Sequence, residues 1–341
     1  MDKTLKITQS KVSILIPVYN VELFIERCAN SLFSQTYHNI EFIFANDCTP
    51  DNSMQLLRKV ISYYPTRKDQ VLIVNNTENK GIGQTRTTLL SSATGDYLLW
   101  VDSDDFIAEN AVELLVSAIE ESESDIVTSD TYIFYKGDEN QILFSQQFPT
   151  NPKQYIEAIA CHRARAALWG TLSKRNIWLD NNISILKSST YGEDYFATVQ
   201  LFYFSRKYQI IHFPFYYYNQ VNINSYTTGY KSENHFVSMI NLFDNLMLFF
   251  QKHNSESDYS LFLKKARITE FCGLLLHTTA DLRRKYSYVL KMQELRLFYV
   301  DVSVTKWQYF LLKQIILKRF ILSDILLFKA KILRIIFKIK F

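Results

Sequence analysis

The sequence is poor in the residues that mark several protein classes. Its 341 residues include only 8 Gly and 6 Pro, which argues against a collagen-like or linker-rich chain. The 4 Cys lie far apart and form no Cys-x-x-Cys pair, so neither a metal cluster nor a disulfide framework is predicted. The 6 His show no H-x-x-x-H or H-E-x-x-H spacing, which excludes the common zinc-enzyme signatures.

Long apolar runs are also missing. No stretch approaches about 18 uncharged apolar residues, so no transmembrane span is predicted. The start, MDKTLKITQS, is too polar for a secretory signal peptide, so reduced cysteines in the cytoplasm are expected. The net charge is only +4, so no nucleic-acid partner is expected. The hydrophobic fraction of 48% is ample for a packed core, which excludes a disordered chain.

Strand-like and helix-like segments alternate over the first 135 residues. Five apolar runs predict strands, at residues 12–18, 41–45, 71–75, 97–101 and 125–129. Four segments with helical spacing lie between them, at residues 22–34, 51–64, 83–93 and 108–122. This order predicts an α/β fold with a mostly parallel sheet and helices on both faces. Asp47 and Asp102 each follow a strand, at the edge where such sheets bind ligands.

The densest acidic group is Asp102-Ser103-Asp104-Asp105, directly after the apolar run YLLWV. Neighbouring carboxylates repel one another unless a cation lies between them. Mg²⁺ and Mn²⁺ are commonly held by one or two carboxylates together with substrate phosphates. The alternative is that Asp105 only caps the helix predicted from Ala108.

Three further segments carry polar side chains at loops. Asp47 could accept a hydrogen bond from a nucleobase, whereas the nearby Asp51 and Ser53 are explained by helix capping. The loop NKGIG at residues 79–83 lets the backbone approach a ligand closely, and Arg86 could brace carboxylates or a diphosphate. The alternative is a plain turn followed by a surface arginine.

Glu193 and Asp194 begin a predicted apolar helix. A capping box with Thr190 would explain Glu193 but not Asp194. An aspartate on the first turn, with a pKa near 4, would be ionised and able to take a proton from a bound hydroxyl. Catalysis and capping both remain open on these residues alone.

Taken together, six segments resemble the family 2 glycosyltransferases, inverting enzymes of the GT-A fold. They occur in the family's order across residues 10 to 225: VSILIPVYN, FIFANDCTPDNS, NKGIGQTR, GDYLLWVDSDD, LWGTLSKR and GEDYFATVQLF. The resemblance implies an enzyme that transfers a sugar from a UDP-sugar to a glycan or lipid-linked acceptor, in bacterial polysaccharide assembly such as capsule or lipopolysaccharide. It also implies Mn²⁺ or Mg²⁺ as cofactor.

The resemblance assigns a role to each matching residue. The donor pocket would contain Pro17, Tyr19, Asp47, Arg86, Asp102 and Trp169, with Tyr19 stacking on the base and Trp169 beside the sugar. Asp104 and Asp102 would be the metal ligands of the D-x-D motif. Asp194 would be the general base, and Glu193 would touch donor or acceptor.

The chain departs from the family pattern at three positions, which puts donor choice in doubt but not the base or the metal ligands. Cys48 replaces the usual glycine, Thr87 a common asparagine and Asn219 a frequent arginine. One alternative function is a non-catalytic nucleotide-sugar-binding partner in a membrane-associated glycan-assembly complex. The other is a nucleotidyltransferase, which would need a basic glycine loop after the first strand, where VYNVELF has none.

The domain prediction places a GT-A catalytic domain at residues 1–230, a helical domain at 231–304 and a basic amphipathic tail at 305–341. From Lys306 onward the tail has nine Lys or Arg and one acid, Asp324, among large apolar residues. As one continuous helix it would suit peripheral contact with an anionic leaflet, at the cytoplasmic face of the inner membrane. The alternative is a helical cap that packs on the rest of the protein.

Overall fold

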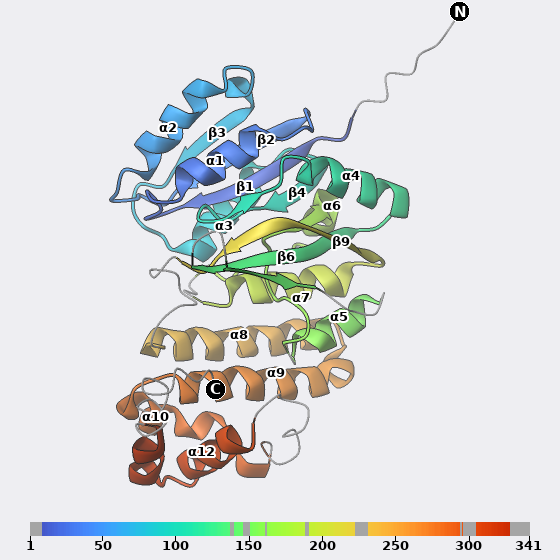
Figure 1. Ribbon diagram of the computed structural model, residues 1–341. Coiled ribbons are helices and arrows are strands. Elements are labelled where there is room, and N and C mark those ends of the chain that lie inside the picture. Colours follow the sequence, from blue (N-terminus) through green and yellow to red (C-terminus); the bar gives the residue numbers. More distant parts are fainter. Residues whose placement is uncertain are drawn as a thin grey trace, which may run out of the picture. The chain divides into compact units, whose positions relative to one another are not determined.

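The computed structural model of the chain describes residues 9–136, 140–145, 151–160, 162–187, 191–221, 231–293, 295 and 305–327. The chain divides into two compact units (Figure 1). The first contains Met1–Ile156 and Ala166–Thr228, and the second contains Glu157–Arg165 and Gly229–Phe341. The second unit therefore includes a short stretch from the middle of the chain. The predicted domain boundaries at residues 230 and 304 remain predictions.

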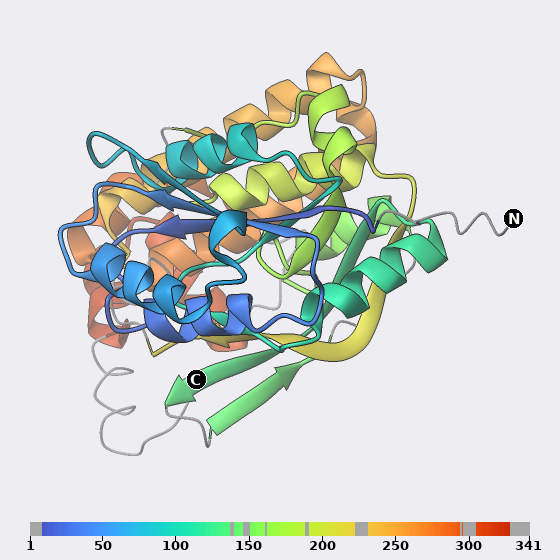
Figure 2. The ribbon, with the colours of Figure 1, turned by 90° about the horizontal axis from the view of Figure 1, so that it is seen from above.

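The first unit is built on a sheet in the order β3-β2-β1-β4-β8-β6-β9-β5, with β7 paired to β6 (Figures 1 and 2). The strands are β1 (Val12–Val18), β2 (Ile40–Asn46), β3 (Val71–Asn75), β4 (Tyr97–Trp100), β5 (Phe106–Ile107), β6 (Ile126–Lys136), β7 (Asn140–Phe144), β8 (Thr171–Lys174) and β9 (Tyr208–Asn219). The four strands β3, β2, β1 and β4 are parallel, as the sequence predicts. From β8 onward the sheet is mixed, because β8 runs antiparallel to both β4 and β6.

Helices cover both faces of this sheet. They are α1 (Ile25–Phe33), α2 (Ser53–Tyr63), α3 (Ile82–Ser92), α4 (Ala111–Ser122), α6 (Arg175–Asp180) and α7 (Glu193–Phe204). A further helix, α5 (Pro152–Ile159), begins in the first unit and ends in the second. Every residue of β1 is buried, as expected for a strand covered on both faces. Alternate β1 residues such as Ile14 and Ile16 join one core with α1, α2 and α4. On the other face α3 packs on β1 and β2, and Trp100 of β4 packs on Trp178 of α6.

The sequence prediction misses the short strands β5, β7 and β8, and it places the starts of α1 and α4 three residues too early. β5 has two residues and β8 has four, too few for a periodic apolar signal. The helix predicted from Ala108 begins at Ala111. The preceding residues pair instead with β9, and the backbone N–H of Ala108 donates to Phe215 O at 2.8 Å.

The described part of the second unit is helical. Its main elements are α8 (Glu233–Lys252), α9 (Glu256–Leu276), α10 (Ala280–Tyr286), a 3₁₀ turn at Ser287–Val289 and α12 (Lys306–Ile316). The helices α8 and α9 pack together after a short turn (Figure 1). In the described segments, no helix combines the length and apolarity needed to cross a membrane.

The described part of the tail is not one continuous helix. α12 ends at Ile316, Lys318 adopts φ +57°, and a second helical segment covers residues 320–327. The turn lets Asp324 reach back to α10, where its carboxylate lies 3.0 Å from Arg283 Nη2 and 2.9 Å from Arg284 Nη2. This part of the tail therefore packs on the helical unit. The basic residues from Lys329 onward lie outside the described residues.

Candidate functional site

The loop after β3 is tied to Asp47, at the carboxyl end of β2. The Asp47 carboxylate is 3% exposed and accepts hydrogen bonds from Asn76 Nδ2 at 2.7 Å and from the backbone N–H groups of Lys80 and Gly81, both at 2.9 Å. These bonds fix the glycine loop ahead of α3. Contact between Asp47 and a nucleobase stays a prediction.

The two glycines of this loop serve the local backbone. Gly81 adopts φ +80° at the N-cap of α3, a conformation that costs glycine little. A Cβ added at Gly83 would lie 2.0 Å from the backbone oxygen of Leu186. At Gly83 the close approach is therefore to the chain itself, at the 186–187 segment, whereas a Cβ at Gly81 would meet no atom within 4 Å.

Arg86 on α3 lies at the centre of the acidic residues. Its side chain is almost fully buried, so the alternative of a surface arginine is wrong. Its Nη2 lies 2.9 Å from Asp102 Oδ1, and its Nε lies 3.6 Å from Glu193 Oε1. Burial alone would lower the pKa of Arg86, but the carboxylates of Asp102 and Glu193 raise it, so the guanidinium stays charged.

In the part of the chain that the structure describes, two of the nitrogen atoms of the Arg86 guanidinium donate no hydrogen bond. Among the described residues, its Nε and Nη1 have no hydrogen-bond partner. Buried donors of this kind are rare in folded proteins, because each loses its bonds to water without replacement. An anionic ligand at this point would satisfy them.

Glu193 and Asp194 lie at the start of α7. Gly192 is the N-cap, with φ +87°, so Glu193 is the first helical residue and not the third residue of a capping box. Thr190 itself lies outside the described residues. Asp194 Oδ1 accepts a hydrogen bond from the backbone N–H of Tyr195 at 2.8 Å.

The expected pKa near 4 for Asp194 is wrong. Burial, and next the charge of Glu193, raise the pKa of Asp194 to about 8, although Arg86 opposes the shift. Burial also raises the pKa of Glu193, again against the effect of Arg86. Two acids therefore lie beside a single cation, and burial leaves the pKa of both above that of an exposed carboxyl.

The acidic loop after β4 contains one residue that the sequence reading misassigned. Asp105 is not a helix cap, since α4 begins at Ala111 after Asn110. Asp105 is 1% exposed and accepts hydrogen bonds from Tyr216 Oη and from the backbone N–H of Asn219, both at 2.7 Å. Burial, and then the charges of Asp104 and Asp102, raise the pKa of Asp105 well above its ordinary value.

The donor set of this loop fits a divalent cation bound together with substrate. No three His, Cys, Asp or Glu side chains converge to form a complete metal site in the described ranges. Asp102 and Asp104 supply two carboxylates, and Asp104 is partly exposed. Mg²⁺ and Mn²⁺ accept such a partial set, because substrate phosphates and water complete their coordination.

The remaining predicted residues lie around the same strand ends. Pro17 is buried in β1, whereas Tyr19, just beyond that strand, is 42% exposed. The Trp169 ring stacks on Tyr216 at 4.7 Å and on Tyr218 at 4.8 Å between centroids. The sequence reading missed Tyr216, whose hydroxyl reaches Asp105, because an aromatic run gives no sign of which ring bonds to an acid.

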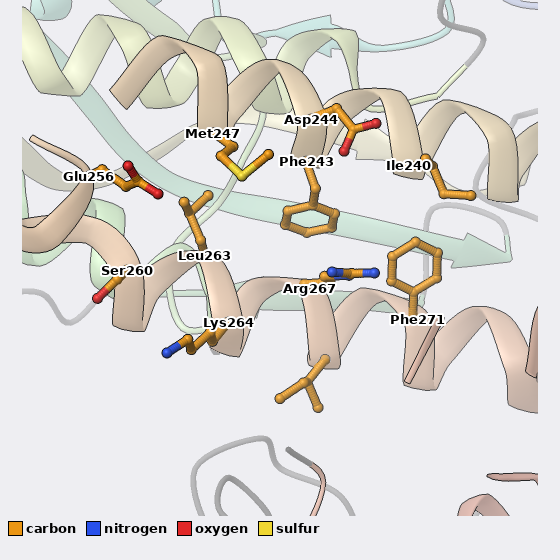
Figure 3. Close-up of a pocket in the computed structure, with 11 residues that line it drawn as sticks. Ile240, Phe243, Asp244, Met247, Glu256, Ser260, Leu263, Lys264, Arg267 and Phe271 are labelled. Atoms are coloured by element: carbon orange, nitrogen blue, oxygen red, sulfur yellow. The ribbon is translucent and has the colours of Figure 1, made fainter. Parts of the chain in front are cut away.

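A separate cavity of about 270 Å³ lies between α8 and α9 in the second unit. Figure 3 shows Phe243 and Met247 of α8 pointing toward Leu263 and Arg267 of α9. The lining residues include none of those predicted for the site.

Part of the chain is similar in sequence to named glycosyltransferases. Residues 13–173 match the model of glycosyl transferase family 2. The chain is 27% identical over 253 residues to the putative glycosyltransferase EpsH of Bacillus subtilis, covering 73% of this chain and 71% of EpsH. It is 27% identical over 218 residues to glycosyltransferase GlyA of Streptococcus pneumoniae, covering 59% of this chain but only 29% of GlyA.

The fold is shared with a solved glycosyltransferase. TarS of Staphylococcus aureus (residues 1–349, with UDP-GlcNAc) matches with a TM-score of 0.60 and 18% identity, covering 94% of this chain and 91% of that chain. Residues 13–173 thus form a glycosyl transferase family 2 domain, and the chain has the GT-A fold of the TarS structures.

Proposed function

We propose that the chain is an inverting glycosyltransferase that moves a sugar from a UDP-sugar to a hydroxyl of a glycan or lipid-linked acceptor. The observation that carries this proposal is the position of Arg86, which lies against both Asp102 of the strand-end loop and Glu193 of α7. The arginine thereby joins the loop proposed to hold the donor to the helix that carries the proposed base.

In this proposal Asp194 is the general base. Its carboxylate takes the proton of the acceptor hydroxyl while that oxygen forms a bond to the anomeric carbon. The bond from the anomeric carbon to the diphosphate breaks on the opposite face, and UDP leaves with the electron pair. A single displacement inverts the anomeric centre and requires no covalent enzyme intermediate.

The other residues stabilise the leaving diphosphate and position the donor. The unpartnered Nε and Nη1 of Arg86 are suited to bind its oxygens. Asp104 and Asp102 would hold Mn²⁺ or Mg²⁺, which when bound offsets the charge that develops on the diphosphate. Pro17, Tyr19 and Asp47 would contact the uridine, and Trp169 would lie beside the sugar.

Known relatives support a nucleotide-sugar donor without fixing which one. TarS has been crystallised with UDP and with UDP-GlcNAc. A mannosyltransferase of Pyrobaculum calidifontis, crystallised with GDP-Man and Mn²⁺, matches with a TM-score of 0.50 and 16% identity, covering 93% of this chain and 86% of that chain. We favour UDP, and a donor panel decides between the two nucleotides.

The experiment is to measure binding and hydrolysis of UDP-, GDP- and dTDP-sugars with and without Mn²⁺. Wild type is compared with Asp104→Ala and Asp194→Asn. We expect metal-dependent binding of one UDP-sugar, lost in Asp104→Ala and retained without turnover in Asp194→Asn. Binding without turnover in wild type, across a range of acceptors, would favour the non-catalytic partner instead. No binding of any nucleotide sugar would refute the proposal.

We also propose that the tail contacts a membrane surface at the cytoplasmic face, near a lipid-linked acceptor. The described part exposes a set of large apolar side chains: Trp307, Phe310, Leu317, Ile321, Leu322 and Ile325. Exposed Lys318 and Arg319 lie among them, as is usual for interfacial helices.

The membrane proposal is tested by sedimentation of the full chain with vesicles that contain anionic lipid. Ile321→Ser combined with Ile325→Ser should reduce binding severalfold, because both side chains would leave the lipid. Leu23→Ser is the control, since Leu23 is more exposed than either isoleucine but lies in the first unit. Equal binding by all three proteins would exclude the tail as the contact.

A further inference from the structure

We propose that Tyr216 and Asp105 are positioning residues that hold the Asp102–Asp104 loop in the orientation needed to bind a divalent cation. This inference rests on the proposed function, in which Asp102 and Asp104 are the metal ligands. It gives a role to two residues that the resemblance to the family does not assign.

A single hydroxyl group connects the two ends of the loop. Tyr216 Oη accepts a hydrogen bond from the backbone N–H of Asp102 at 3.1 Å. The same oxygen donates to Asp105 Oδ2 at 2.7 Å. The residues on either side of Ser103 and Asp104 are therefore fixed by one side chain of β9.

Asn219 at the end of β9 adds two more bonds. Its backbone N–H donates to Asp105 Oδ1 at 2.7 Å, and its Nδ2 donates to the carbonyl oxygen of Asp104 at 3.2 Å. Both oxygens of Asp105 are thus engaged by β9. All contacts to Asp102 and Asp104 in this network use main-chain atoms, so the network does not consume their carboxylates.

The hydroxyl of Tyr216 is held in place by packing. The Tyr216 side chain is fully buried, and its ring stacks on Trp169. A Cβ added at Gly170 would lie 3.2 Å from the Tyr216 ring, which shows how closely the backbone approaches it. A buried carboxylate such as Asp105 is costly unless it is hydrogen-bonded, and here each oxygen has a donor. Residues that orient metal ligands typically change metal affinity about 10- to 100-fold when they are substituted.

The test measures Mn²⁺ binding to the full chain in the presence of saturating UDP, from the electron paramagnetic resonance signal of free Mn²⁺. Tyr216→Phe keeps the ring that stacks on Trp169 and removes only the hydroxyl. We expect its dissociation constant for Mn²⁺ to rise about tenfold or more, with UDP binding in the absence of metal unchanged. Asn219→Ala, which removes one of the donors, should give a smaller rise.

The matched control is Tyr217→Phe. Tyr217 neighbours Tyr216 on the same strand, but its ring stacks on Phe106, at 4.5 Å between centroids. Its Mn²⁺ affinity should equal that of wild type.

Each other outcome has a defined meaning. Wild-type Mn²⁺ affinity in both Tyr216→Phe and Asn219→Ala would overturn the positioning role. A parallel loss of Mn²⁺ binding and metal-free UDP binding would also overturn it, because general disruption would then be the cause. If wild type bound UDP but no Mn²⁺, the metal part of the proposed function would fail and this inference with it, whereas failure to bind UDP at all would refute the proposed function itself.

Discussion

At the residue scale, the two acids of α7 differ from surface carboxylates because they share one buried arginine. Burial disfavours the charge on both, and Arg86 can compensate only part of that cost. This is the environment in which enzymes raise the pKa of a carboxylate toward the pH at which it works as a base.

The first prediction concerns the pH dependence of turnover. With a pKa of about 8 for Asp194 in the free enzyme, kcat/KM for transfer should rise about tenfold per pH unit below pH 8 and level off above it. Glu193→Gln should lower the inflection, because the charge of Glu193 raises the pKa of Asp194. An inflection near pH 4 in wild type would contradict Asp194 as the base in this environment.

The second prediction concerns stability. The folded state binds the Asp194 proton more tightly than the unfolded chain, so Asp194 lowers the free energy of unfolding as pH rises from about 4 to about 8. Asp194→Asn removes this loss. The unfolding free energy of Asp194→Asn relative to wild type should increase by about 2 kcal/mol or more between pH 5 and pH 8.5. Thermal unfolding would show this as an increase of roughly 4–8 °C in the difference in Tm. A stability difference between Asp194→Asn and wild type that became smaller as pH rose would refute the raised pKa of Asp194.

At the element scale, the site depends on how closely α3 approaches the segment before α7. Gly83→Ala places a methyl group against the backbone oxygen of Leu186, which a rigid main chain cannot avoid without moving. We expect a loss of about 1–3 kcal/mol in unfolding free energy, together with weaker donor binding because Arg86 lies on the same helix. Denaturant unfolding measures the first effect and calorimetry the second.

Gly273→Ala in α9 is the control for this substitution. A Cβ at Gly273 meets no atom within 4 Å, so alanine there should stabilise the helix by about 0.5–1 kcal/mol. Equal effects of the two substitutions would mean that the approach of α3 to Leu186 carries no cost.

Some elements of the fold could be predicted from the sequence, and some contacts between them could not. Strands with continuous apolar runs, such as β1 and β4, are predictable within a residue or two, because burial on both faces dictates their composition. Asp102 stands out because it follows such a strand, and Asp194 stands out because it begins an apolar helix. The hydrogen bonds of Tyr216 could not be predicted, because a contact across 114 residues, such as that of Asp102 with Tyr216, leaves no local pattern in the sequence.

At the scale of the whole molecule, part of the tail is joined to the helical unit by ion pairs. Asp324→Ala would leave the buried Arg283 without this carboxylate, and we expect a loss of about 1–3 kcal/mol in unfolding free energy. Asp281→Ala is the control, since Asp281 also pairs with Arg284 but is almost fully exposed, and should cost at most about 0.5 kcal/mol. Similar losses in chemical denaturation for the two variants would contradict an anchoring role for Asp324.

The inclusion of residues 157–165 in the second unit has a consequence for synthesis on the ribosome. Ala160 O accepts a hydrogen bond from Thr269 Oγ1 at 2.9 Å, and His162 Nε2 lies 2.8 Å from Glu270 Oε1, 108 residues later in the chain. At about 5–20 residues per second, this stretch leaves the ribosome roughly 5–20 seconds before its partners exist. The whole first unit is therefore synthesised before residues 157–165 can make their contacts in the second unit.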